Sequence, residues 1–266
     1  MQAFPQSRRP PTAMRLALRV LWIIPLTGMM SGAYAADFTR AEVQSALTAS
    51  PAGQGASFAG RSFANLDLHD LDFTGADLSG SDLSEADLRG AKLVAAKLVG
   101  AKLQRARLNL AWIMRADFSH ADLSGADLET LVVSAGMETV PEEAAKFVGA
   151  KLSGAKVTAR FSLDDMRGAD LSYLHASADM RNQSMGLIRA DFSRANLAGA
   201  NFTDAELAHV NFEFAKLQHA NFSGADLSDA DFAGADLTDA DLTGARTTGV
   251  NFTSAVLTRI KGFSLH

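Results

Sequence analysis

The chain has 266 residues, no Cys and a formal net charge of −5, and 47% of its residues are hydrophobic. The lack of Cys excludes a disulfide framework, a Cys-ligated metal site and a thiol nucleophile. The acidic balance provides no electrostatic footprint for DNA or RNA. Because there are 48 Ala but only 2 Trp and 2 Tyr, we expect a core built from small residues, Leu and Phe.

Residues 1–35 have the layout of a secretory signal peptide. Four Arg precede the apolar stretch over 20–30, and Ala33-Tyr34-Ala35 forms a small-x-small cleavage site. The apolar stretch is too short to span a bilayer. We therefore predict cleavage after Ala35, a periplasmic or secreted protein, and no membrane span after cleavage. A segment that stays attached as an anchor is the alternative, and the true start codon is either Met1 or Met14.

Removal of residues 1–35 changes the charge balance. The segment contains four Arg and no acidic residue, so the net charge goes from −5 to −9. The predicted mature protein is therefore strongly acidic.

Residues 36–55 predict a short helix followed by a linker. Thr39 and Glu42 have the spacing of a capping box, which marks a helix N-terminus. We predict a helix over Thr39–Leu47. An open end of a repeat domain exposes its core, so we expect this helix to cap the domain that follows.

A five-residue repeat fills residues 56–259, as in Ala76-Asp77-Leu78 and Ala121-Asp122-Leu123. On a helix, a period of five scatters the central residues around the cylinder, and on a flat strand it places them on alternating faces. All of them lie inside only if the chain turns a corner once per repeat. The two positions after each central residue are rich in Ser, Thr and Gly, which favour turns.

If four corners close one coil, stacked positions are four repeats apart. The sequence supports this spacing, because outward positions such as Asp77, Lys97 and Asp117 alternate in sign at every fourth repeat. Strands roughly 4.8 Å apart bring such charges opposite one another, where unlike pairs are favourable. Two predicted core columns follow the same spacing: Phe192, Phe212, Phe232 and Phe252, and Leu197, Leu217, Leu237 and Leu257.

The Ala-(Asp/Asn)-Leu-x-x pattern resembles the pentapeptide-repeat family over nearly all of residues 56–259. The resemblance implies an all-β fold, a right-handed quadrilateral β-helix, to which the predicted N-terminal helix adds a cap. It also implies one possible function. In the best-understood branch of the family, an acidic protein imitates duplex DNA and binds DNA gyrase, which protects the enzyme from quinolones.

Two segments interrupt the repeat, near 129–144 and 177–186. Pro141-Glu142-Glu143 resembles the first turn of a helix, so we expect an acidic bulge in the first interruption. Loops on a rigid scaffold often carry function, although an insertion tolerated at a corner is an equally good interpretation. The candidate interaction residues are Glu138, Glu142, Glu143, Asp179 and Arg181.

Residues 260–266 must cover the last coil or contact a partner. Ile260, Phe263 and Leu265 place three apolar side chains in this short segment. A two-fold contact between copies would cover both ends, and the resembled family often dimerises in this way. In the alternative, the three side chains fold back over their own last coil and the protein is a monomer.

No motif indicates catalysis. Asp is abundant, but its regular spacing and its alternation with Asn and Lys are typical of a solvated column rather than of a catalytic pair. No phosphate loop, triad or metal motif is present, so we predict neither an enzyme nor a cofactor. The leading hypothesis is an exported, non-enzymatic scaffold that binds a protein or an envelope component. The gyrase-binding alternative conflicts with export and with the basic block over Lys92–Arg107.

Overall fold

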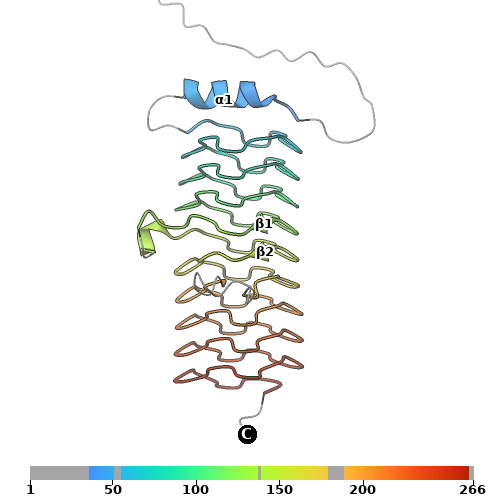
Figure 1. The fold of residues 1–266 in the computed structure, drawn as a ribbon, viewed down its shortest axis with the longest axis vertical. Coiled ribbons are helices and arrows are strands. Elements are labelled where there is room, and N and C mark those ends of the chain that lie inside the picture. The colour runs from blue at the N-terminus through green and yellow to red at the C-terminus, as the bar shows by residue number, and fades with distance from the viewer. Residues whose placement is uncertain (1–35, 51–54, 137–138, 179–188, 264–266) are drawn as a thin grey trace, which may run out of the picture. The chain divides into compact units, whose positions relative to one another are not determined.

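The computed structural model describes residues 36–50, 55–136, 139–178 and 189–263, so the predicted signal peptide and its cleavage site lie outside the described residues. The regular elements are α1 over Arg40–Ala49, β1 over Asp127–Leu128, the 3-10 helix η1 over Pro141–Glu143, and β2 over Lys156–Val157. Most of the remaining chain consists of single bridge residues separated by two-residue turns. Figure 1 shows these segments as a stack of coils.

Four ladders of parallel bridges connect successive coils. In uninterrupted regions each outward residue pairs with the outward residue four repeats later, as in Asp77 with Lys97. The predicted coil of four repeats is therefore present. Ladder 1 runs through Ser57, Asp77 and Lys97, ladder 2 through Ser62, Asp82 and Lys102, ladder 3 through Asp67, Asp87 and Arg107, and ladder 4 through Asp72, Lys92 and Trp112.

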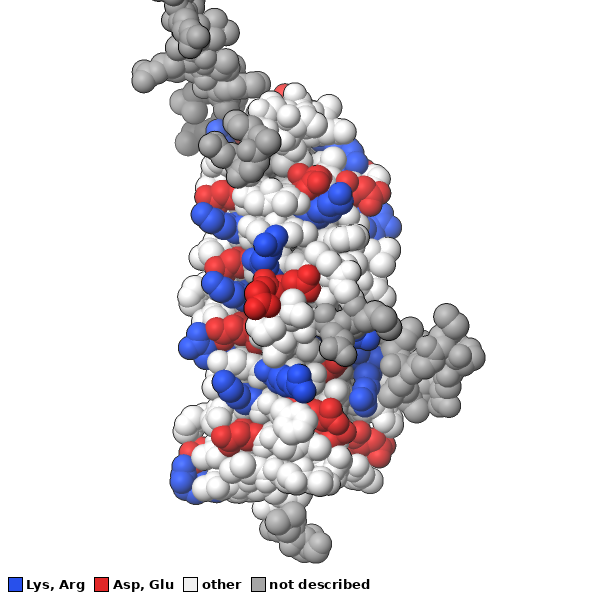
Figure 2. Space-filling view, turned by 90° about the vertical axis from the view of Figure 1, so that its left-hand side faces the viewer, with Lys and Arg blue, Asp and Glu red and all other residues white. Residues whose placement is uncertain are grey.

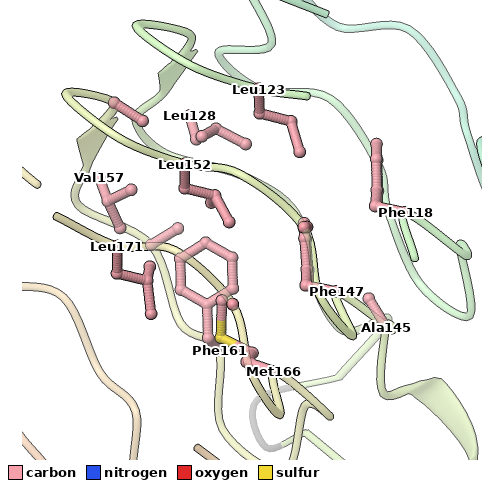
Figure 3. Packing of buried hydrophobic residues seen from close by; sticks show 14 of the residues in the cluster. Phe118, Leu123, Leu128, Ala145, Phe147, Leu152, Val157, Phe161, Met166 and Leu171 are labelled. Atoms are coloured by element: carbon pink, nitrogen blue, oxygen red, sulfur yellow. The ribbon is translucent and has the colours of Figure 1, made fainter. Parts of the chain in front are cut away.

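The interior is filled by the central Leu and Phe side chains and by the Ala that precedes most outward residues. The rings of Phe192 and Phe212 stack with centroids 5.4 Å apart, and those of Phe212 and Phe232 are 4.8 Å apart. Figure 3 shows how Phe118 and Phe147 continue this packing farther up the core. Burying each such side chain contributes roughly 1.5–3 kcal/mol, so the columns provide most of the stabilisation.

The two predicted core columns are buried except at their last members. Phe192, Phe212 and Phe232, and likewise Leu197, Leu217 and Leu237, have no exposed surface. Phe252 and Leu257 are only half buried. They pack against the core but belong to the last coil, which has a neighbouring coil on one side only, so they are not fully enclosed.

Each corner is fixed by backbone and side-chain hydrogen bonds. The outward Asp77 accepts a hydrogen bond from the backbone N–H of Ser79 at 3.0 Å, and the same contact recurs at many repeats. The second turn residue adopts a positive φ, for example 59° at His120. Asn and Asp tolerate this conformation, and Gly adopts it without strain. The outward carboxylates therefore build the turns as well as facing solvent.

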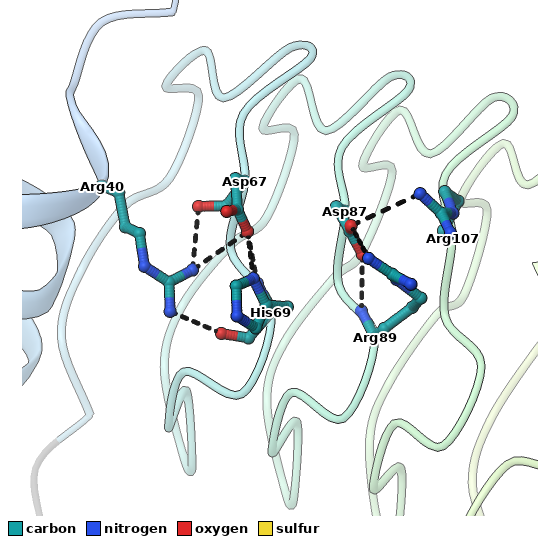
Figure 4. Close-up of polar contacts among 6 residues, drawn as sticks. All are labelled: Arg40, Asp67, His69, Asp87, Arg89 and Arg107. Atoms are coloured by element: carbon teal, nitrogen blue, oxygen red, sulfur yellow. Dashed lines mark hydrogen bonds and ion pairs between the residues drawn. The ribbon is translucent and has the colours of Figure 1, made fainter.

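The helix α1 contacts the first coil. Thr39 is its N-cap and forms the predicted capping box with Glu42. The helix begins one residue after and ends two residues after the predicted range Thr39–Leu47. Val43 is completely buried, and Arg40 donates hydrogen bonds to the carbonyl oxygens of Asp67 and His69 at 3.1 and 2.8 Å (Figure 4).

The first insertion is shorter than the sequence suggested. Val132 still bridges to Trp112 at the regular spacing of four repeats, so residues 129–132 belong to the repeat. Asp117 then bridges to Lys146, well beyond the regular spacing, so the additional chain lies between Val132 and Lys146. We call residues 133–144 the first insertion. It contains η1, which projects sideways from the coils in Figure 1.

The second insertion lies mostly outside the described residues. In ladder 3, His175 bridges to Glu206 across a sequence separation of 31. The regular separation in the same ladder is 20, as between Asp87 and Arg107, so one coil contains additional chain. We call residues 177–189 the second insertion. The backbone N–H of Ala178 still donates to the carbonyl of Ala208 at 3.3 Å, and the repeat resumes at Ala190.

At the C-terminal end, Phe263 lies against the last coil. Its ring centroid is 4.9 Å from that of Phe252, and Ile260 also packs against the core. Leu265 lies outside the described residues. Within the part of the chain that the structure describes, no helix is long and apolar enough to cross a membrane.

Candidate functional site

Charge on the coils is arranged in bands. From Asp77 to Asp170, successive coils present acidic and basic outward residues in turn on ladders 1 and 2, so each band there lies against bands of the opposite sign. Elsewhere the alternation fails, as at the bridged pair Glu206 and Asp226. Lys102 lies 3.7 Å from Asp82, and Arg107 lies 3.5 Å from Asp87 (Figure 4). The bands are Asp77, Asp82 and Asp87, then Lys97, Lys102 and Arg107, then Asp117, Asp122 and Asp127, then Lys146, Lys151 and Lys156, then Asp165 and Asp170.

Between Asp77 and Asp170 the bands leave no long surface of one sign along the coils. Figure 2 shows red and blue side chains alternating down the face turned to the viewer. Hydrogen bonds also hold these carboxylates in their charged form. Burial tends to raise the pKa of Asp122, but hydrogen bonds from Ser124 and Gln104 and the charge of Lys151 outweigh it and lower that pKa. The bands consequently stabilise the stack rather than forming one site.

The coil residues that flank both insertions lie at or next to ladder 4. The first leaves the coil after Val132 of ladder 4 and rejoins at Lys146 of ladder 1. The second leaves after His175 of ladder 3 and rejoins before Asp191 of ladder 4. Ladder 4 is interrupted here, since the described residues show no bridge between Val132 and Arg160. The irregular features of the stack are thus concentrated around one stretch of ladder 4.

A cavity of about 400 Å³ lies in this stretch, and we call it the insertion cleft. Its described lining is mostly polar, with two guanidinium groups and three hydroxyls. Ser162 Oγ lies 3.2 Å from a carboxylate oxygen of Asp191 and 3.1 Å from Ser193 Oγ. The lining residues are Thr139, Arg160, Ser162, Leu163, Asp191, Ser193 and Arg194.

Thr139 connects the first insertion to the cleft. Its hydroxyl oxygen is buried, and among the described residues it has no hydrogen-bond partner. Leaving such a group unpaired costs about 1–3 kcal/mol, so a bound polar group or water would be favourable there. The hydroxyls that the cleft combines with the guanidinium groups of Arg160 and Arg194 are those of Ser162 and Ser193.

One buried carboxyl lies beside the cleft, directly after two lining residues in the chain. Asp164 occupies an inward position that Ala fills in most repeats, and only 2% of its surface is exposed. Its Oδ1 accepts a hydrogen bond from the backbone N–H of Ala145 at 2.8 Å, whereas Oδ2 has no partner among the described residues. Burial raises the pKa of Asp164 to about 8, against the lowering effect of the Ala145 hydrogen bond.

The predicted interaction residues are only partly accounted for. Glu142 is exposed on η1. The carboxylate of Glu143 instead accepts hydrogen bonds from Ser134 at 2.7 Å and from the N–H of Ala135 at 3.3 Å, so it holds the first insertion together. Its role as an interaction residue stays a prediction. Glu138, Asp179 and Arg181 lie outside the described residues.

Sequence reasoning missed the cleft and Asp164. Most lining residues come from two coils that are joined in ladder 4 by the bridge between Arg160 and Asp191. A regular spacing of four repeats does not predict this bridge, because the second insertion lies between the two residues. A signal for Asp164 was present, because Asp164-Asp165-Met166 replaces the usual Ala before an outward residue. No group of three His, Asp or Glu that could hold a metal ion occurs among the residues described.

Comparison with known protein families identifies the type of repeat. The sequence profile of pentapeptide repeats matches 8 copies, at residues 54–90, 91–129, 187–224, 205–244 and 220–259. These ranges together cover more than half of the chain. No curated protein matches it.

Several solved structures are similar to this chain. HetL, a pentapeptide repeat protein involved in heterocyst differentiation regulation from the cyanobacterium Nostoc sp. strain PCC 7120, is 29% identical over 81% of this chain and 95% of its own, with a TM-score of 0.31. Trypsin-treated QnrB1, a plasmid-mediated fluoroquinolone resistance protein, is 20% identical over 74% and 83%, with a TM-score of 0.41. Rfr23 from the cyanobacterium Cyanothece 51142 is 23% identical over 55% and 86%, with a TM-score of 0.36.

The profile match, the five-residue period and the four ladders agree with one another. On these grounds, this chain belongs to the pentapeptide-repeat family.

Proposed function

We propose that the protein is an exported, non-enzymatic scaffold and that it binds a protein or envelope component at the insertion cleft. The observation that carries this proposal is the position of the cleft: Thr139 of the first insertion and coil residues just after the second, such as Asp191 and Ser193, line one polar cavity. Binding sites are typically concave and contain a few converging polar groups on a rigid scaffold. The guanidinium groups and hydroxyls of the lining favour a partner that presents hydrogen-bond acceptors.

Site-specific photo-crosslinking tests the cleft. A photoreactive residue at Ser193 is expected to form a discrete adduct with an envelope component in living cells. Ala233 is the matched control, because it lies at the same corner two coils farther on and is similarly half buried. Equal adducts from both positions, or none from Ser193, would contradict a binding site in the cleft.

Export is the second part of the proposal and has its own test. The Arg-rich start and the Ala33-Tyr34-Ala35 site support it. Mass spectrometry of protein purified from cells should find the N-terminus at Ala36. An intact N-terminus in the cytosolic fraction would reject export and favour the gyrase-binding alternative, against which the alternating charge bands argue.

We further propose that the coil is right-handed, as the family implies, and that α1 caps its N-terminal end. The burial of Val43 and the stacking of Phe38 on Phe63, with ring centroids 5.5 Å apart, support the cap. An uncapped coil would expose both core side chains and unpaired backbone groups.

The C-terminal end is proposed to form a homodimer. Val250, Phe252 and Leu257 are all half buried there, and among the described residues the N–H groups of Phe252 and Leu257 have no backbone partner. A two-fold contact would cover these groups in both copies. The contact of Phe263 with Phe252 supports the competing arrangement, in which the segment covers its own coil.

A further inference from the structure

The contact between Asp164 and Ala145 replaces a turn hydrogen bond that the first insertion removes. In regular coils the residue at the Ala145 position donates its N–H to a carbonyl three residues earlier, as Ala116 does to Ile113 at 2.9 Å. The first insertion displaces that turn before Ala145. The Ala145 N–H instead reaches Asp164 Oδ1 at 2.8 Å, one coil farther on.

We propose that Asp164 is a proton-controlled latch that fastens the end of the first insertion to the next coil. Ala145 is 3% exposed, so water does not replace the lost turn acceptor. The buried N–H of Ala145 still needs a hydrogen-bond acceptor, and the Asp164 carboxyl provides it. We call residues 139–145, which lead from the first insertion back to the coils, the return segment. Because this segment contains Thr139 and η1 as well as Ala145, the latch also fixes one wall of the insertion cleft. As a regulator of partner binding, the latch rests on the proposed function of the cleft.

The charged groups around Asp164 do not neutralise it. On its own coil Asp165 pairs with Arg167 at 2.7 Å, and from the return segment Glu143 bonds to Ser134. Lys146 on the coil before and Arg194 on the coil after are exposed. Among the described residues no charged side chain bonds to Asp164, so the carboxyl is fastened as a neutral acid with Oδ1 accepting and the proton on Oδ2.

The direction of the pH effect follows from this burial. The folded pKa of about 8 lies above the ordinary value of 3.8, so the latch is strongest in acid and weakens as the pH rises toward 8. Opening of the return segment lets water reach the carboxylate. If the open form has the ordinary pKa, the opening equilibrium rises about tenfold per pH unit between pH 5 and 7 and levels off above pH 8.

Amide hydrogen exchange of the full chain between pH 5 and 8.5 tests the latch, after correction for the intrinsic exchange rate. Protection of the Ala145 N–H should fall with that pH dependence. Ala150 is the internal reference, because its N–H keeps the regular turn bond to Phe147 at 3.0 Å and should not respond. Asp164→Asn retains an acceptor but does not titrate, so protection of Ala145 should become independent of pH.

Two further variants complete the test. Asp164→Ala should abolish the protection of Ala145 at every pH, and Asp165→Asn, which changes the half-buried neighbour, should leave the wild-type pH dependence intact. A pH-independent wild type, the same slope in Asp164→Asn, or a parallel change at Ala150 would overturn the latch. The exchange measurement needs no partner, so its result does not depend on whether the cleft binds one. Photo-crosslinking at Ser193 at two pH values then tests whether the latch regulates partner binding.

Discussion

The hydroxyl of Ser228 donates a hydrogen bond to Oδ1 of Asp226 at 2.6 Å, and the backbone N–H of Ser228 donates to the same oxygen at 3.1 Å. These two bonds close a turn that begins at the outward residue of the repeat. Asp226 also lies 3.4 Å from Arg246 on the next coil. The side chain therefore connects a corner to a charge band, and the two roles can be separated by substitution.

Asp226→Asn should cost less than about 1 kcal/mol, because the amide oxygen still accepts from Ser228 and only the exposed ion pair with Arg246 is lost. Asp226→Ala should cost more, about 0.5–2 kcal/mol, because the turn loses its side-chain acceptor. Urea unfolding of both variants checks this order. Equal losses would mean that the Ser228 contacts contribute nothing.

Leu217 tests the core. The side chain has no exposed surface and lies one coil from Leu197 and from Leu237. Leu217→Ala should cost about 2–5 kcal/mol because it leaves a cavity. Leu217→Asp should cost more than Leu217→Ala, since it buries a charge without a partner. Thermal melts compare both with Asp226→Asn, and a loss at Leu217 no larger than at Asp226 would reverse the assignment of inward and outward positions.

Acid should destabilise the protein through the outward carboxylates. The pKa of Asp122 is lowered below its ordinary value of 3.8, although burial alone would raise it, because Ser124 and Gln104 bond to the charged form. A depressed folded pKa gives stability that is present above pH 3.8 and is lost as the pH falls through the folded value. The melting temperature should therefore drop below about pH 4, and Asp122→Asn should make that drop smaller.

Sedimentation tests the proposed dimer. The wild type is expected to sediment as a dimer at micromolar concentration, and Phe263→Asp as a monomer, because the charge opposes burial of the end. Thr258→Asp, on an exposed turn of the same coil, is the control and should remain dimeric. A monomeric wild type would favour the arrangement in which Phe263 covers only its own coil.

The repeat made much of the fold predictable from the sequence. A period of five allows every Leu and Phe to be buried only if the chain turns once per repeat, and the sign alternation of Asp77, Lys97 and Asp117 then identified four repeats per coil. The helix start was also predictable, because Thr39 and Glu42 form a capping box from local spacing alone. Local rules succeed here because every coil contacts only its neighbours.

The tertiary structure decided what happens where the period fails. Asp117 bridges to Lys146 across the first insertion and Arg160 bridges to Asp191 across the second, so ladder 1 continues past the first insertion and ladder 4 past the second. No local signal in the sequence fixes these pairings, since an insertion can leave and rejoin a coil at any corner. The cleft and the Asp164–Ala145 contact depend on that choice, because only stacking brings residues from different coils within hydrogen-bonding distance.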